Sequence, residues 1–194
     1  MPRADREQQL LDVAEGVFAQ HGLAISMDEL ARRAGISKPV LYDHFSSKDG
    51  LIVACFARAR AQLLAETVAA VATATSTRER LELGLRAFFT FIDAHGDAFG
   101  VLLTDAALSS HPPAQEMERI RAQQAEVITR LLAGDLPGTA ADELMPLAEA
   151  VIGATERLAV WRRGRPDVTP ARAAVLLMGL LWDGLSAQVG GAPR

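Results

Sequence analysis

Four side chains in one short stretch, residues 38–48, have the chemistry to bind phosphates: Lys38, Tyr42, His44 and Lys48. Two ammonium groups, a phenol and an imidazole all donate hydrogen bonds that suit phosphate oxygens. Lys38 and Lys48 are also the only lysines among the 194 residues, since every other cation is an arginine. This stretch is therefore the part of the chain best suited to a polyanion.

The charge balance gives weaker support. The formal net charge is −4, and residues 1–60 hold eight Lys/Arg and eight Asp/Glu. The remaining twelve basic and sixteen acidic residues lie in 61–194, so the acidity belongs to the later part of the chain. A strongly basic domain would be the clear signal of nucleic-acid binding, and it is missing. The first third is only the less unfavourable place for a polyanion.

Composition bounds the class of protein. The chain is 49% hydrophobic, which allows a sizeable core, and its single cysteine excludes an intrachain disulfide. No Cys/His spacing predicts zinc, and no motif predicts a cofactor. The first ten residues are too polar for a signal peptide. The longest apolar run, Ala173–Trp182, is well short of the ~20 residues of a membrane span. We therefore expect a soluble cytoplasmic protein without metal, cofactor or membrane contact.

Hydrophobic spacing predicts an all-α fold, because apolar residues recur at helical intervals and no sustained strand alternation occurs. Gly or Pro marks the expected breaks, including one at His95-Gly96. The expected helices are Arg6–His21, Met27–Ala34, Lys38–Phe45, Ser47–Val71, Thr77–His95, Asp97–Leu108, Pro113–Ala133, Ala140–Arg163 and Thr169–Val189.

The second and third helices have the features of a helix-turn-helix. Ser26 and Glu29 form the pattern of a capping box, and Gly35 supplies the tight turn. Ser37 is expected to cap the next helix, where Pro39 in the first turn costs no hydrogen bond. Ser46 or Ser47 is expected to cap the long helix that follows. The N-terminal part thus predicts a three-helix DNA-binding unit.

Helical geometry then sorts the residues of the third helix. Leu41 and Phe45 share one face and are expected in the core, whereas Pro39, Val40 and Asp43 point away from it. An outward Val40 can meet a thymine methyl, and Asp43 can accept a hydrogen bond from cytosine N4. The two flanks carry Tyr42 and His44. Lys48 lies in the first turn of the next helix, where free N–H groups already favour anions.

The stretch "AGISKPVLYDHFSSKDGL" resembles the helix-turn-helix signature of the TetR family of transcriptional regulators, as do "ISMDELARRAG" and "FAQHGL" upstream. The resemblance covers roughly residues 6–55. By that resemblance, Tyr42, His44 and Lys48 would contact phosphates. The residues Lys38, Pro39, Val40 and Asp43 would face bases or the adjoining backbone. Many family members have a basic or aromatic residue where this chain has Asp43, so the role of Asp43 is open. The DNA-binding residues that we expect are Ser26, Ser37, Lys38, Pro39, Val40, Tyr42, Asp43, His44 and Lys48.

The resemblance also implies a division of the chain. Residues 1–48 would bind DNA, and 49–194 would bind a small ligand and dimerise, with a bridging helix at about 47–71. The last two helices are the most apolar and would form a homodimer interface. A largely hydrophobic effector would occupy a pocket among the middle helices. The candidate lining residues are Phe88, Phe91, Phe99, Leu103, Met117, Ile120, Ile128, Thr155 and Trp161.

The function expected from these features is a DNA-binding regulator, a repressor released from a pseudo-palindromic operator by its effector. The alternative is an effector-independent DNA-binding or architectural protein. An interaction protein that has lost DNA binding is a further alternative. An enzyme is not expected, because the four histidines are scattered and no phosphate-cradling glycine loop is present.

Overall fold

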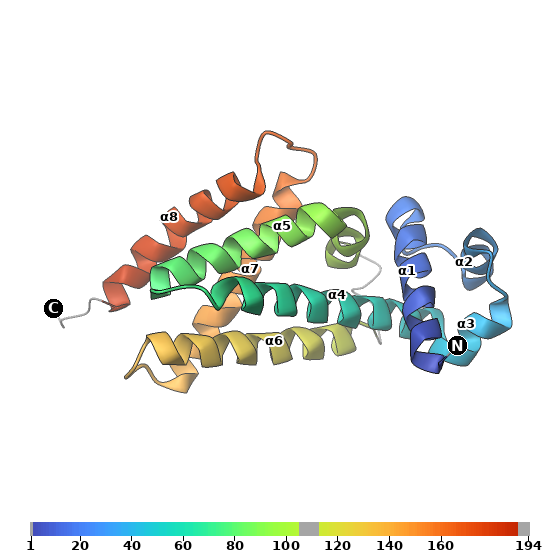
Figure 1. The fold of residues 1–194 in the computed structure, drawn as a ribbon, viewed down its shortest axis with the longest axis horizontal. Coiled ribbons are helices and arrows are strands. Elements are labelled where there is room, and N and C mark those ends of the chain that lie inside the picture. The colour runs from blue at the N-terminus through green and yellow to red at the C-terminus, as the bar shows by residue number, and fades with distance from the viewer. Residues whose placement is uncertain (1, 105–112, 190–194) are drawn as a thin grey trace. The chain divides into compact units, whose positions relative to one another are not determined.

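The computed structural model describes residues 2–104 and 113–189, apart from the side chains at 96–104, 113, 116, 117, 124, 135, 141, 183 and 185–189. Every regular element in these ranges is a helix, which confirms the all-α prediction (Figure 1). The helices are α1 (Arg3–His21), α2 (Met27–Ala34), α3 (Lys38–Phe45), α4 (Lys48–Val71), α5 (Thr77–Thr104), α6 (Pro113–Asp135), α7 (Ala141–Arg162) and α8 (Pro170–Val189).

The expected break at His95-Gly96 is wrong, because α5 continues through it to Thr104. A glycine inside a helix costs only about 1 kcal/mol relative to alanine, so it weakens a helix without ending it. Unlike Gly22 and Gly35, where the backbone has a positive φ, Gly96 follows the helix. The predicted helix 97–108 is therefore the second half of α5 as far as Thr104, and residues 105–108 lie outside the described part.

The chain divides into two compact units, of which the first comprises Met1–Gln62 and His95–Ile120. Its core gathers apolar side chains from α1, α2, α3 and the start of α4, with Phe18, Leu41 and Phe56 almost fully enclosed. The single cysteine, Cys55, belongs to this core, and burial raises the pKa of its thiol.

Arg58 joins α4 to α1 inside the first unit. Its guanidinium donates to the Glu15 carboxylate at 3.1 Å, to Asp12 at 2.7 Å and to the Gln8 carbonyl oxygen at 3.1 Å. Burial by itself would lower the pKa of Arg58, but the Glu15 and Asp12 carboxylates outweigh it and raise that pKa. The charged contacts therefore fix the first half of α4 against α1.

The second unit comprises Leu63–Ala94 and Arg121–Arg194, and α7 packs on α8 within it. A buried charge links α5 to the end of α7. Arg162, with a side chain only 8% exposed, forms two hydrogen bonds to Asp93 at 2.6 and 3.0 Å. Its Nε also donates to the Val168 carbonyl oxygen at 3.0 Å, and its guanidinium lies 5.6 Å from the Phe89 ring centroid. The sequence analysis did not identify this pair, because its two partners are 69 residues apart in the chain.

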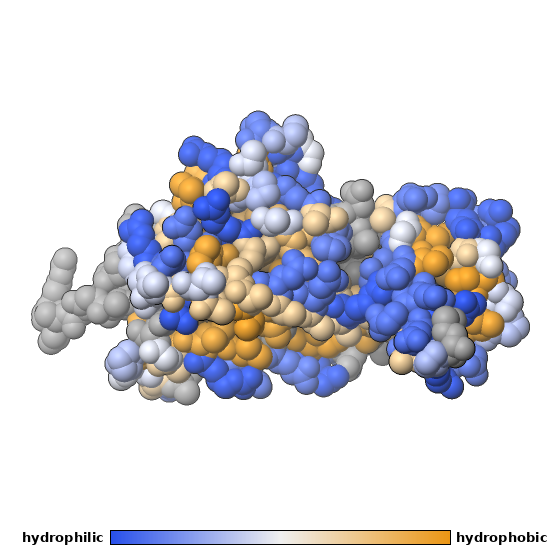
Figure 2. Space-filling model, in the orientation of Figure 1, coloured by the Kyte–Doolittle hydropathy of each residue, from blue (hydrophilic) through white to orange (hydrophobic). Residues whose placement is uncertain are grey.

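Large apolar side chains also remain exposed in the second unit. On α8 these are Val175, Leu176 and Leu180, the last of them 70% exposed. Their spacing places all three along one side of the helix, next to Gly179. On the face shown in Figure 2, apolar residues also gather over α4 and α6.

Searched over the described residues, the structure has no helix that combines the length and the apolar character of a membrane span.

Candidate nucleic-acid interface and apolar cavity

The ends of α2 are fixed by its own sequence. The Ser26 hydroxyl accepts a hydrogen bond from the Glu29 backbone N–H at 3.2 Å, which confirms the predicted cap. Gly35 has a left-handed conformation, φ 63° and ψ 28°, that favours glycine. The Ile36 N–H then donates to the Ala31 carbonyl oxygen at 3.0 Å and completes the C-terminal cap. The turn between α2 and α3 is therefore set locally.

The start of α3 differs from the expectation. Ser37 is the N-cap residue, but its side chain makes no capping hydrogen bond. Pro39 lacks the N–H of the second helical position, and the Val40 N–H is already bonded to the Ser37 carbonyl oxygen at 3.1 Å. The Ser37 hydroxyl consequently has no free backbone N–H to cap. It is exposed at the surface, where it can form a hydrogen bond to another molecule.

Exposure of the α3 side chains follows the predicted faces with one exception. Leu41 and Phe45 are buried, while Lys38, Pro39, Tyr42 and Asp43 are exposed. The exception is Val40, which is half-buried and packs against the first unit's core, so it does not point away from it. Val40 directly precedes the buried Leu41, only about 100° around the helix from it, so its side chain still reaches the edge of the core.

His44 is half-buried, and its Nδ1 atom is enclosed without a hydrogen-bond partner in the described residues. Its ring lies 6.0 Å from the Phe45 ring, measured between centroids. Because one ring nitrogen is enclosed, only Nε2 can serve an external partner. His44 thus differs from Tyr42, whose side chain is exposed.

A tight turn connects α3 to α4. Ser46 has a positive φ of 59°, and the Ser47 hydroxyl accepts from the Gly50 N–H at 3.0 Å, so Ser47 is the cap. A Cβ atom at Gly50 would lie 2.3 Å from the Phe45 carbonyl oxygen, which no real contact allows. Gly50 therefore permits the first turn of α4 to approach the end of α3 closely. This approach places Lys48, in that first turn, beside α3.

Two ion pairs bind the charged residues of α3. The Lys38 Nζ lies 2.6 Å from the Asp28 carboxylate of α2, and that contact raises the pKa of Lys38. Asp43 is paired with Arg3 of α1, which lies 3.9 Å from its carboxylate and donates to its main-chain oxygen at 3.0 Å. Neither Arg3 nor Asp28 was expected from the motif, because the pairing depends on how the helices cross.

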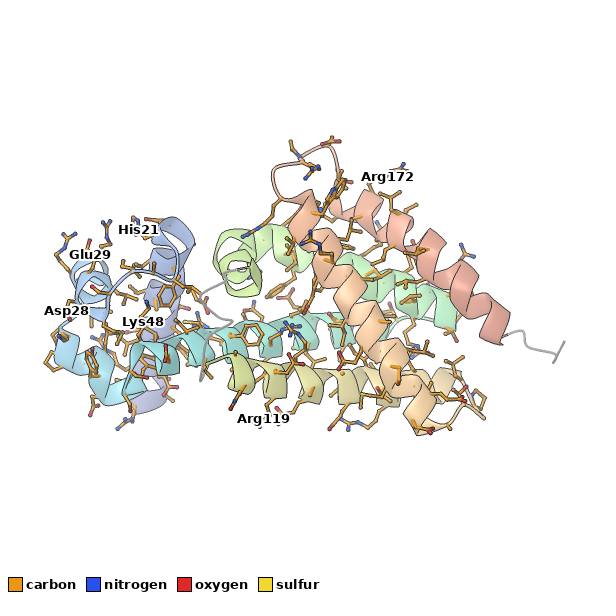
Figure 3. All side chains as sticks on the ribbon, turned by 180° about the vertical axis from the view of Figure 1, so that it is seen from behind. His21, Asp28, Glu29, Lys48, Arg119 and Arg172 are labelled. Atoms are coloured by element: carbon orange, nitrogen blue, oxygen red, sulfur yellow. The ribbon has the colours of Figure 1, made fainter. Side chains whose placement is uncertain are left out.

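A third charged group lies on α2. The Glu29 carboxylate accepts from Arg32 at 2.7 and 2.6 Å and from Arg33 at 2.6 Å, and these bonds, Arg32's first, lower the pKa of Glu29 to about 2. Arg33 also reaches the His21 Nε2 at 2.9 Å. Figure 3 shows His21, Asp28, Glu29 and Lys48 on the ends of α1, α2 and α4. Cations and carboxylates therefore alternate over this surface.

The second unit contains a cavity of about 170 Å³. Side chains of α4, α5, α6, α7 and α8 line it, and most are leucine, isoleucine or valine. Four polar residues join them, Thr67, Thr77, Arg80 and Thr155. The Thr155 hydroxyl donates to the Val151 carbonyl oxygen at 2.5 Å, so it has only lone pairs and a methyl group left for a guest.

Three of the nine candidate lining residues, Phe88, Ile128 and Thr155, lie at this cavity. Phe91 is fully buried elsewhere in the second unit's core, and Trp161 is 46% exposed beneath the Arg165 guanidinium.

Ile120 packs against the core of the first unit. Phe99, Leu103 and Met117 have side chains outside the described residues. Sequence periodicity identifies an apolar face but does not show which part of it borders a void, so the leucines of α4 and α6 were missed.

A short capped helix with exposed donors, preceded by a glycine turn and followed by a second helix start, defines a helix-turn-helix DNA-binding protein. Residues 10–55 match the family model described as bacterial regulatory proteins, tetR family, and 77–184 match the tetracyclin repressor-like C-terminal domain. The chain belongs to the TetR family and is a DNA-binding transcriptional regulator.

Individual relatives agree with this assignment. The HTH-type transcriptional activator FasR of Mycolicibacterium smegmatis is 30% identical over 188 residues, 96% of this chain and 85% of that protein. A TetR-like regulator from Rhodococcus sp. RHA1 superimposes with a TM-score of 0.73 at 33% identity, over 96% of this chain and 98% of that one. FadR from Bacillus subtilis in complex with stearoyl-CoA shares the fold, with a TM-score of 0.77 at 15% identity over 90% and 96% of the two chains.

Proposed function

We propose that α3 enters the major groove and that the start of α4 contacts the adjoining phosphates. The observation that carries this proposal is the exposed row of Ser37, Lys38, Pro39 and Tyr42 beside Lys48. Tyr42, Lys48 and the Nε2 of His44 would bind phosphates, as would the start of α2 at Ser26. Lys38, Pro39 and Asp43 would face bases or nearby backbone, with Val40 limited to its exposed edge. Residues 1–48 would act as the DNA-binding domain and 49–194 as the ligand-binding and dimerisation domain.

Anisotropy of labelled duplexes from the region upstream of its own gene tests DNA binding. Lys48→Ala should weaken binding to every sequence and reduce the slope of log K against log salt by about 0.9, because one phosphate contact is lost. Arg130→Ala is the matched control, since Arg130 is an exposed cation on α6, outside the proposed DNA-contacting and dimer surfaces. Equal effects of the two variants, or binding independent of salt, would refute the proposed interface.

The protein would act as a homodimer through α7 and α8. The exposed Val175, Leu176 and Leu180 support this, because three large apolar side chains on one helix face favour contact with a second surface. A twofold dimer presents two α3 helices to half-sites about one DNA turn apart, which suits a pseudo-palindromic operator. Leu180→Arg should give a monomer by sedimentation and weaken operator binding. Ala69→Arg, an exposed position on α4, should leave the dimer intact.

The effector would be small and largely hydrophobic, because the cavity is bordered mainly by apolar side chains. Its 170 Å³ is close to the roughly 150 Å³ of an engineered apolar cavity that accepts benzene. A ligand of that size fits with little displacement of the walls. A long acyl chain, such as that bound by FadR, would require the walls to move apart.

Regulation would proceed through α4. This helix begins beside α3 at Lys48 and supplies Leu63, Leu64, Thr67, Val68 and Val71 to the cavity wall. A ligand that fits better when α4 is displaced would favour the state that does not bind DNA, and the protein would then be a repressor in the cytoplasm. FasR, in contrast, is named an activator. An effector that strengthens DNA binding would reverse the sign of the change in DNA affinity.

Thermal stability against a panel of small apolar compounds distinguishes this regulator from an effector-independent one. At 100 times its Kd, a ligand stabilises the folded state by about 2.7 kcal/mol, or roughly 5–10 °C in Tm for a chain of this size. A true effector must also change DNA affinity in the anisotropy assay. If compounds raise Tm without changing DNA affinity, the effector-independent alternative is favoured.

A further inference from the structure

Lys38, the first residue of α3, already forms an ion pair with a carboxylate of the same chain. Its Nζ lies 2.6 Å from an Asp28 oxygen, and both side chains are largely exposed, at 52% and 67%. Asp28 lies in the first turn of α2 (Figure 3). The pair therefore connects the two helices of the helix-turn-helix. The same Nζ is 5.7 Å from the centroid of the Tyr42 ring. Asp28 is thus paired with Lys38 within the surface proposed to contact DNA.

The second lysine is in a different state. Lys48 is half-buried in the first turn of α4, and among the described residues it has no ion pair. Its charge is available to a phosphate as soon as DNA approaches. Within the part of the chain that the structure describes, the two lysines that flank α3 therefore differ, since Lys38 has a carboxylate partner to exchange and Lys48 has none.

A carboxylate at this distance resembles a phosphate oxygen in charge and in hydrogen-bonding capacity. When DNA docks, Lys38 either leaves Asp28 for a phosphate or base, or keeps Asp28 and brings that negative charge close to the backbone. The first course loses an ion pair, and the second adds repulsion. Because the pair is exposed, the exchange is possible and its cost is small.

We propose that Asp28 is a built-in competitor of DNA for Lys38, lowering the affinity of the interface for any duplex. This inference rests on the proposed function of α3 as the DNA-contacting helix. Its consequence is weaker retention on bulk DNA, because each duplex must displace Asp28 before Lys38 contributes.

The test measures anisotropy of a labelled duplex of mixed sequence over a range of salt concentrations. Asp28→Asn should tighten binding about two- to fivefold, which corresponds to one exposed ion pair. It should also steepen the salt slope by up to about 0.9, because Lys38 becomes a further phosphate contact. Glu126→Gln removes the same charge from an exposed position on α6, which is assigned neither to DNA contact nor to the dimer, and should change neither quantity.

Lys38→Ala and the double variant provide the decisive comparison. If Asp28 acts through Lys38, then Asp28→Asn in the Lys38→Ala background should tighten binding by much less than in the wild-type background. An equal gain in both backgrounds would overturn the inference, since it would reflect net charge alone. Unchanged or weaker binding by Asp28→Asn would overturn it as well, and would make Asp28 a residue that orients Lys38.

Two further measurements distinguish the competitor role of Asp28 from a change in stability and from a failure of the proposed DNA-binding function. Asp28 also interacts favourably with the N-terminus of α2, so Asp28→Asn is expected to lower Tm by at most about 4 °C, and binding is measured where all variants are folded. If wild-type binding is independent of salt and of Lys48→Ala, the proposed function itself fails. If both effects are present and Asp28→Asn has none, only the competitor role fails.

Discussion

The ion pair between Arg162 and Asp93 predicts unequal effects of removing its two partners. Arg162 is buried at 8% exposure, whereas Asp93 is 46% exposed. Asp93→Ala leaves the guanidinium enclosed and removes two of its three hydrogen-bond acceptor atoms, so that only the Val168 carbonyl oxygen remains. Arg162→Met instead replaces the cation by an apolar chain over Phe89 and leaves a carboxylate that water can reach.

The structure sets the magnitudes. Breaking a buried pair by removing one partner costs about 3–5 kcal/mol. Because water can reach the half-exposed Asp93 position, we expect about 2–3 kcal/mol for Asp93→Ala. Arg162→Met loses the bond to Val168 but strands no buried charge, so about 1 kcal/mol is expected. The double variant should then cost little more than Arg162→Met alone, a strongly non-additive result.

Urea unfolding followed by circular dichroism at 25 °C measures these free energies. All four proteins are compared at one protomer concentration, because association with a second copy would change the apparent stability. If Arg162→Met destabilises as much as Asp93→Ala, or if the two effects add, then the burial of the arginine does not govern the pair and the reasoning is refuted.

Three further changes test local features. Gly84→Ala should raise Tm by about 2–4 °C, because a helix-interior glycine is replaced where a Cβ has ordinary contacts; a lower Tm would contradict this. Gly50→Ala should destabilise by about 1–3 kcal/mol and weaken DNA binding, since its Cβ would overlap the Phe45 carbonyl oxygen; unchanged urea unfolding would argue against it. Hydrogen bonds led by Arg32 lower the pKa of Glu29 from 4.5 to about 2, so its ionised form favours the folded state. Glu29→Gln should therefore be less stable at pH 7, and melting curves should show the difference disappearing as the pH falls from 4.5 toward 2.

Local signals in the sequence were sufficient for most of the fold. The Ser26 cap, the Gly35 turn and the Ser47 start involve residues a few positions apart, and the structure confirms all three. Gly96 shows the limit of such signals. A glycine marks a helix end only where a positive φ is needed, and a residue type alone does not reveal whether the backbone requires one.

The candidate site was predictable only in part, because its electrostatics come from helix crossings. The motif identified Lys38 and Asp43 but not their partners, Asp28 and Arg3, which lie on other helices. Ser37 was expected to cap α3, but the residue two positions on, Pro39, removed the N–H that makes such a cap useful. Pairing across elements depends on geometry that appears only once the helices are packed.

The rate at which the enclosed thiol of Cys55 is alkylated measures how often the core of the first unit opens. The thiol is fully buried among side chains of the first unit, and burial keeps it protonated, so an alkylating reagent cannot react in the closed state. Each alkylation event therefore requires a transient opening that exposes this core. The ratio of its rate to that of a free thiol gives the population of the opened form, in the same way as amide exchange. With no other cysteine among these 194 residues, mass spectrometry can follow that population in the intact chain with and without DNA.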